Sequence, residues 1–177
     1  ENKYTQNPLL LTSEYKNQII IWLNNNNNNK ENNNNNNNKE NFTNFSFELL
    51  HKASTNGYSA KAFHNSCDNK GPTITICKNE KKILLGGYNN INWTSEDGVE
   101  TFDPDSSCFL FNLTNKLKQN QGKEKWAIYN SENWGPIFGD DLCIADNCNT
   151  NKYSYSIIGT CYSNDINGEN INLFEDE

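Results

Sequence analysis

Residues 59–88 constrain the fold of this chain more than any other stretch, because they predict a short helix followed by a two-stranded hairpin. Ala60, Phe63 and Cys67 recur at the spacing of one helical face. Ser59 stands just before them and is a favourable N-cap, since its hydroxyl can accept a hydrogen bond from a free amide of the first turn. We therefore predict that a helix begins directly after this serine.

The hairpin follows a glycine-proline pair at residues 71–72, which ends any helix. Residues 73–78 alternate isoleucine with threonine or cysteine, the pattern of a half-buried strand. A polar turn then leads to a return strand from Ile83. Gly86 and Gly87 inside this strand predict either a bulge or a place where another backbone comes close. This stretch predicts a scaffold and carries no chemistry of its own.

The length and composition fit one domain. A compact chain of 177 residues buries about 70% of the surface that it exposes when unfolded, enough for a single core. The chain has no methionine and begins at Glu1, so we expect that neighbouring segments of a longer product are missing. No apolar run reaches the roughly 18 residues that a membrane span needs.

The charge of the chain speaks against nucleic-acid binding. All 15 basic residues are lysines, and the formal net charge is -7. Guanidinium groups make most of the bidentate contacts to phosphate and guanine, and a net negative chain repels a polyanion.

The cysteines favour a reduced, cytosolic protein. Six cysteines would suit disulfide bonds in a secreted protein, but a chain of this length can bury a core without them. Two of them lie in strand-like runs, where a thiol behaves as a small buried apolar group. The cysteines are Cys67, Cys77, Cys108, Cys143, Cys148 and Cys161.

The N-terminal segment, residues 1–23, predicts a helix that packs on the domain. Residues 9–23 place apolar side chains along one helical face, with Thr12 or Ser13 as the cap. An amphipathic segment that binds a partner is the alternative.

Residues 24–40 consist of two asparagine runs without an apolar side chain. Ordering them costs backbone entropy and buries nothing, so we predict a disordered surface insertion. A coil of this length spans on the order of 20 Å, which lets it leave the domain and rejoin it. Asparagine ladders also stabilise stacked strands, so self-association through this segment is an alternative.

Residues 41–177 predict a sheet domain. Phe45, Phe47 and Leu49 alternate and predict a strand within residues 42–53. Residues 89–104 are rich in turn formers, and Trp93 is their expected core anchor. Further short strands are predicted at residues 108–113, 126–129, 136–139, 141–144 and 153–158. Roughly eight or nine short strands with Gly, Asn and Asp turns predict an α+β fold, an antiparallel β-sandwich flanked by a few short helices.

No constellation of side chains nominates an enzyme, a metal or a cofactor. A zinc site would draw on His64, Cys67, Cys143 and Cys148, but the chain has no Cys-x2-Cys pair, so unrelated buried thiols are the favoured interpretation. A cysteine-protease pair of Cys67 with a histidine lacks any family signature. Two acid pairs are interpreted first as turn formers, Asp103 with Asp105 and Asp140 with Asp141. The run Asp103-Pro104-Asp105 lacks the glycine and terminal glutamate of a calcium loop. No dinucleotide-binding, P-loop or nucleophile-elbow motif is present.

The central stretch resembles the TLDc domain, an oxidation-resistance family. The resemblance rests on Phe63-His64 followed by Cys67-Asp68, and on the runs Gly-Pro-Thr-Ile-Thr-Ile and Leu-Gly-Gly-Tyr. It continues through residues 108–113 and 135–144 and covers nearly the whole chain apart from the asparagine insertion, which together with the helix before it resembles protist members. The family's closing strand, rich in Phe, Val and Glu, has no clear counterpart before the chain ends. The motif residues, expected to be mainly structural, are Phe63, Gly71, Pro72, Gly86, Gly87, Tyr88, Trp93, Phe109, Phe111, Gly135, Pro136, Phe138, Gly139 and Asp141.

The resemblance implies a helix-flanked β-sandwich that confers resistance to oxidative stress and binds the vacuolar proton-pumping ATPase to regulate its assembly. It brings no catalytic residue and no cofactor. We therefore expect a non-enzymatic interaction module in the cytoplasm, recruited to acidic-organelle membranes through its partner. The alternative is a redox protein in which an exposed thiol, Cys67 or Cys148, reacts with peroxide.

Overall fold

The computed structural model describes residues 11–31, 45–122, 124–157 and 159–163. The chain forms two units, Glu1–Glu48 and Leu49–Glu177. None of the described helices is long and apolar enough to cross a membrane.

The first unit contains one long helix, α1 (Ser13–Glu31). Thr12 caps it, because its hydroxyl oxygen accepts a hydrogen bond from the amide of Tyr15 at 3.3 Å. The helix continues past Leu23 into the asparagine run, further than its apolar face extends. Asparagine costs about half a kcal/mol per helical position, and adding a residue to a formed helix is far easier than starting one. The rest of the predicted insertion, residues 32–40, lies outside the described residues.

The second unit begins with two short helices, α2 (Ala53–Asn56) and α3 (Ala60–Cys67). The prediction that Ser59 caps the second of them is confirmed, since its hydroxyl oxygen accepts a hydrogen bond from the amide of Ala62 at 3.2 Å. The predicted hairpin follows as β1 and β2, in unbroken antiparallel register from Thr73 opposite Asn89 to Lys78 opposite Leu84.

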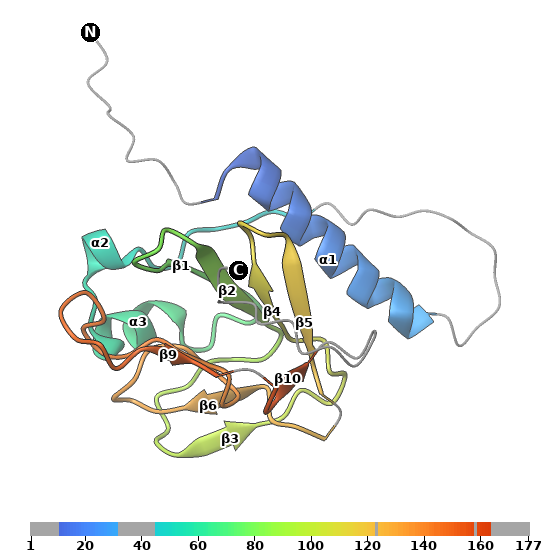
Figure 1. Ribbon diagram of the computed structural model, residues 1–177. Coiled ribbons are helices and arrows are strands. Elements are labelled where there is room, and N and C mark those ends of the chain that lie inside the picture. The colour runs from blue at the N-terminus through green and yellow to red at the C-terminus, as the bar shows by residue number, and fades with distance from the viewer. Residues whose placement is uncertain (1–10, 32–44, 123, 158, 164–177) are drawn as a thin grey trace, which may run out of the picture. The chain divides into compact units, whose positions relative to one another are not determined.

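In the described residues, ten strands form two antiparallel sheets of five, which confirms the predicted α+β sandwich. Figure 1 shows strands of both sheets together with the short helices α2 and α3. The first sheet has the order β1-β2-β4-β5-β10. Its strands are β1 (Thr73–Lys78), β2 (Leu84–Asn89), β4 (Phe109–Asn112), β5 (Leu117–Gln121) and β10 (Tyr162–Ser163). The second sheet has the order β3-β6-β7-β8-β9. Its strands are β3 (Val99–Thr101), β6 (Ile128–Asn130), β7 (Ile137–Phe138), β8 (Leu142–Cys143) and β9 (Tyr155–Ser156).

One hydrophobic core joins the two sheets to α3. Leu85 and Leu110 from the first sheet meet Phe138 and Leu142 from the second, and Phe63 of α3 packs into the same cluster. Burying each of these side chains contributes roughly 1.5–3 kcal/mol. The core therefore lies between the sheets, and α3 closes one side of it.

One predicted strand is wrong and three strands were missed. Phe45 and Phe47 are half-buried, but Leu49 is 63% exposed beside the half-buried Leu50, and the described residues 45–52 pair with no strand. A strand exists only where a neighbour accepts its hydrogen bonds, and alternation alone does not supply that neighbour. The missed strands are β3, β5 and β10, which are polar or short.

Candidate functional site

The aromatic motif residues divide between the two faces of the first sheet. Trp93 is 1% exposed and lies at the centre of the core, where its ring meets Phe63 and Phe138 edge to face at centroid distances of 5.6 and 5.4 Å. The opposite face carries Phe109, which is tilted against Tyr88 at 5.2 Å. Phe111 lies two residues further along the same strand and shares that face. These side chains are packing elements in the structure.

The glycines of β2 lie where the sandwich is closely packed. A Cβ atom on Gly86 would stand 1.9 Å from the carbonyl oxygen of Thr75, and one on Gly87 would stand 2.6 Å from the ring of Phe138. The pairing of β1 with β2 has no bulge, so the glycine pair marks a close approach of backbone and ring. No room is left there for a ligand.

The remaining motif residues lie around turns. Gly71 has a φ of +77° and lies with Pro72 directly before β1. Gly139 has a φ of +52° in the turn between β7 and β8. Gly135 and Pro136 form two backbone hydrogen bonds with Ile144, at 3.0 and 3.1 Å.

Asp141 is a fully buried carboxylate whose partners are backbone amides. Its oxygens accept hydrogen bonds from Gly159, Thr160 and Cys161 at 2.8, 3.1 and 2.6 Å. Burial raises the pKa of this carboxyl, and the amide hydrogen bonds oppose that rise. These hydrogen bonds attach the chain after β9 to the residue just before β8. The Asp141 side chain is buried, so neither carboxylate oxygen faces solvent.

His64 on α3 is buried and has hydrogen-bond acceptors at both ring nitrogens. Nδ1 lies 2.7 Å from Oδ1 of Asp68, and Nε2 lies 3.0 Å from the carbonyl oxygens of Ser131 and Trp134. Carbonyl oxygens and carboxylates only accept, so both ring nitrogens donate when all these hydrogen bonds form. The hydroxyl of Ser95 donates to the other oxygen of Asp68 at 2.5 Å. This network, which the sequence analysis did not predict, braces α3 and leaves no ring nitrogen for a metal or a substrate.

The predicted redox cysteines lie apart, one on α3 and one in the turn after β8. Burial and the charge of Asp68 raise the pKa of the Cys67 thiol to about 11. Burial also raises the pKa of Cys148. A thiol with a pKa near 11 is about one part in ten thousand thiolate at neutral pH, and only the thiolate reacts readily with peroxide. Among the described residues, no group of three or more His, Cys, Asp or Glu side chains is arranged to hold a metal ion.

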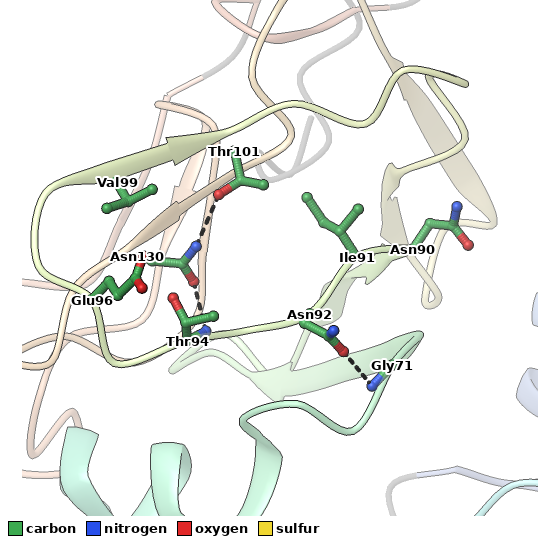
Figure 2. Close-up of a pocket in the computed structure, with 9 residues that line it drawn as sticks. All are labelled: Gly71, Asn90, Ile91, Asn92, Thr94, Glu96, Val99, Thr101 and Asn130. Carbon is green, nitrogen blue, oxygen red and sulfur yellow. Dashed lines mark hydrogen bonds between the residues drawn. The ribbon is translucent and has the colours of Figure 1, made fainter.

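A shallow hollow of about 560 Å³ lies between the segment after β2 and the strand pair β3 and β6 (Figure 2). The asparagine side chains of its lining bond to the surrounding protein, whereas the hydroxyl of Thr94 is buried without a hydrogen-bond partner among the described residues. The side chain of Asn130 accepts a hydrogen bond from the amide of Thr94 and donates one to the hydroxyl of Thr101, both at 3.0 Å. Asn92 accepts one from the amide of Gly71 at 2.7 Å. The lining includes no histidine, cysteine or lysine, so it holds no pair of groups for acid-base chemistry.

An exposed apolar row lies along β9, at one edge of the second sheet. Seven large apolar side chains are exposed in the described part of the chain, and three of these lie within five residues: Tyr153 at 72%, Tyr155 at 42% and Ile157 at 59%. We call these three side chains, with the main chain between them, the β9 edge. The sequence predicted a strand here but did not identify it as a surface. The available signal was the run Tyr-Ser-Tyr-Ser-Ile, which alternates without a charge.

Comparison with known proteins places this architecture in a family. The model of the TLDc domain matches residues 5–176. The MTOR-associated protein MEAK7 of Danio rerio is 30% identical over 67 residues. That match covers 38% of this chain and 14% of the zebrafish protein, so the chain corresponds to a small part of its relative. Because the family model spans nearly the whole sequence, the chain belongs to the TLDc domain family.

Proposed function

We propose that this chain is a non-enzymatic interaction module that supports resistance to oxidative stress by binding the peripheral sector of the vacuolar proton-pumping ATPase and regulating its assembly. The observation that carries the proposal is the match to the TLDc domain over residues 5–176. The module acts from the cytoplasm and reaches acidic-organelle membranes through this partner.

The use of the ionisable groups supports a binding role over catalysis. Catalysis needs groups that face a substrate with free lone pairs or protons. Here the His64 ring is bonded at both nitrogens, and the Asp141 carboxylate accepts three backbone amides. The hollow of Figure 2 has one acid in its described lining, Glu96, and no second ionisable side chain beside it. The polar groups of His64 and Asp141 stabilise the fold. The surface of the domain therefore remains available for contacts with a partner.

The thiol alternative has less support. A peroxide-reactive cysteine needs a lowered pKa and access to solvent. Burial instead raises the pKa of Cys67 to about 11, and those of Cys77 and Cys143 to about 12. We therefore propose that the module protects against oxidation through the partner that it binds and not through a thiol of its own.

Affinity purification tests the proposal. The tagged chain is expressed at a near-native level in cells of its source, and the proteins retained from a lysate are identified by mass spectrometry. Subunits of the peripheral sector of the ATPase are expected to be enriched over a Gly86→Val chain, in which the central sheet is disrupted. Their clean absence at near-native levels removes the ATPase from the proposal. The zebrafish relative is named as MTOR-associated, so enrichment of MTOR instead would keep the interaction role and change the partner.

A further inference from the structure

We propose that the β9 edge is a docking site for an extended peptide segment of a partner protein, one with apolar side chains at alternate positions and lysine or arginine beside them. The inference rests on the proposed interaction function and names the surface that serves it. The peptide adds to the second sheet as a further strand beside β9.

The main chain of β9 has hydrogen-bonding groups that point away from the sheet. The amide of Ile157 donates to the carbonyl of Asp141 at 2.8 Å, which makes this a hydrogen-bonded pair. Cys143 and Tyr155 come two residues further along the ladder and are therefore a hydrogen-bonded pair as well, since the two kinds of pair alternate. Ser156, between them, turns its N–H and C=O outward. A row of outward main-chain groups is what an added strand recognises.

The side chains of the edge match such a strand. Tyr153, Tyr155 and Ile157 follow one another at every second residue, so they project on one face. An added strand places its own alternate side chains beside them. Natural edges are usually protected by a charge, a proline or a bulge, and residues 153–157 include no proline and no charged residue.

The edge is held in place on both sides, so a partner finds it already ordered. Near its start, the hydroxyl oxygen of Ser154 accepts a hydrogen bond from the amide of Ala145 at 3.0 Å. After it, the buried carboxylate of Asp141 accepts hydrogen bonds from the amides of residues 159–161. Binding to a strand that is already ordered costs less conformational entropy.

The size of the edge favours a peptide over a second copy of this chain. Five residues of extended chain span about 17 Å. Pairing two such edges buries far less than the roughly 800 Å² per partner of a stable protein interface. A flexible peptide can instead wrap around the edge and use its main-chain groups fully.

The charges around the edge favour a basic peptide. Asp140 is exposed and lies near Tyr155, whose pKa is raised mainly by burial and further by the neighbouring Cys143, Asp140 and Asp141. Asp146 lies in the turn that leads into the strand, and Lys152 is the neighbouring cation. The chain as a whole carries a formal net charge of -7. A lysine or arginine in the partner therefore finds opposite charge beside the apolar row.

Peptide selection with the full 177-residue chain tests the inference. A random twelve-residue peptide library displayed on phage is selected on the immobilised chain, and enriched peptides are measured by fluorescence anisotropy. We expect alternating apolar residues with lysine or arginine beside them. Ser156→Pro removes the outward N–H without touching the pairing with β8, so it is expected to weaken binding at least about tenfold. Ser156→Ala keeps that N–H and is the matched control, expected to bind within about twofold.

A second measurement needs no variant. Amide hydrogen exchange at Ser156 is expected to slow when an enriched peptide is added, because the amide then donates to the peptide. The inference is overturned if no such peptide is enriched, if Ser156→Pro binds as tightly as Ser156→Ala while folded, or if exchange at Ser156 does not change.

The same variants separate this inference from the proposed function. If the chain co-purifies with the ATPase and folded Ser156→Pro does so equally well, the function stands and the β9 edge is not its surface. If peptides bind the edge but the ATPase is absent from the lysate fraction, the docking site stands and the partner is another protein.

Discussion

The strands β4 and β9 lie in segments with similar alternating aromatic sequences but occupy different positions in their sheets. Aromatic side chains alternate along both segments: Phe109 and Phe111 lie in β4, and Tyr155 of β9 comes two residues after Tyr153. β4 has a neighbour on each side, β2 and β5, and all four of its residues are buried. β9 is the last strand of its sheet, and both of its residues are exposed.

The difference teaches that position within the sheet decides what an aromatic strand does. In the middle of a sheet, both main-chain edges are paired and the side chains contribute to the stability of the fold. At the margin, the same residue types leave main-chain groups and apolar surface for a partner. Substitutions in the centre should therefore change stability, and substitutions along the β9 edge should change binding.

The largest effect is expected at Gly86, beside β4. Gly86→Val places a side chain where a Cβ atom would lie 1.9 Å from the carbonyl oxygen of Thr75. Backbone on a paired strand cannot move aside, so we expect a loss of more than about 3 kcal/mol in the free energy of unfolding. Urea unfolding followed by circular dichroism measures it.

Gly71→Ala is the matched control for that substitution. A Cβ atom on Gly71 meets nothing within 4 Å, but its φ of +77° strains any other residue. The expected loss is about 1 kcal/mol. Equal losses for the two variants would contradict the importance of close packing at the centre.

The second prediction concerns Asp141, whose carboxylate accepts hydrogen bonds from the chain that follows the β9 edge. Asp141→Asn replaces a carboxylate that accepts three amides with a group that has one acceptor oxygen, so one or more amides lose their partner. We expect a loss of about 2–3 kcal/mol and weaker binding of selected peptides. Asp140→Asn at the exposed neighbour is the control for stability, with a change in the free energy of unfolding within about 0.5 kcal/mol. A stable Asp141→Asn would mean that other contacts hold the chain after β9.

The third prediction is a pH dependence of the turn before β4. Burial alone would raise the pKa of Asp103, but hydrogen bonds from Ser107, Asp105 and Cys108 outweigh it and lower the pKa below its ordinary value of 3.8. A lowered folded-state pKa means that the stabilisation is complete above the unfolded-state value and is lost as the pH falls through the folded-state value. Asp103→Asn is therefore expected to cost about 1–2 kcal/mol at pH 7 and clearly less at about pH 2.5. Unfolding curves at both values measure the difference; an equal cost at both would contradict the assignment.

The sequence predicted the elements that have strong local signals. The capped helix from Ser59, the hairpin after it and the buried strand in residues 108–113 were all predicted, because caps, turns and apolar runs are local. It missed β5 because that strand is mostly polar, and its Gln119 is buried nonetheless. Only the neighbouring β4 turns this polar segment into a strand, and pairing across the chain is invisible to a local pattern.

The motif and site residues also divide into those with a local sequence signal and those without one. Motif residues such as Trp93 and Phe138 were identified as core residues, and both are buried in the structure. The brace around His64 was missed, since two of its acceptors are backbone carbonyls 67 and 70 residues away in the sequence. The β9 edge was missed because its alternation predicts a strand without saying which strands lie beside it.

The last prediction compares two exposed aromatic residues at opposite edges of the second sheet. For both we expect small changes in stability, and we expect them to differ clearly in peptide binding. Tyr153 is 72% exposed and Phe102, just after β3 at the opposite edge of the same sheet, is 53% exposed. Tyr153→Ser and Phe102→Ser are each expected to change the free energy of unfolding by less than about 0.5 kcal/mol. Tyr153→Ser alone should weaken a selected peptide about tenfold, because aromatic contacts dominate small interfaces. The β3 strand has the exposed Glu100 at its centre, a charge that protects its edge from pairing. Equal loss of binding in both variants would mean that the peptides adhere to any exposed aromatic, and the two edges would then not differ in function.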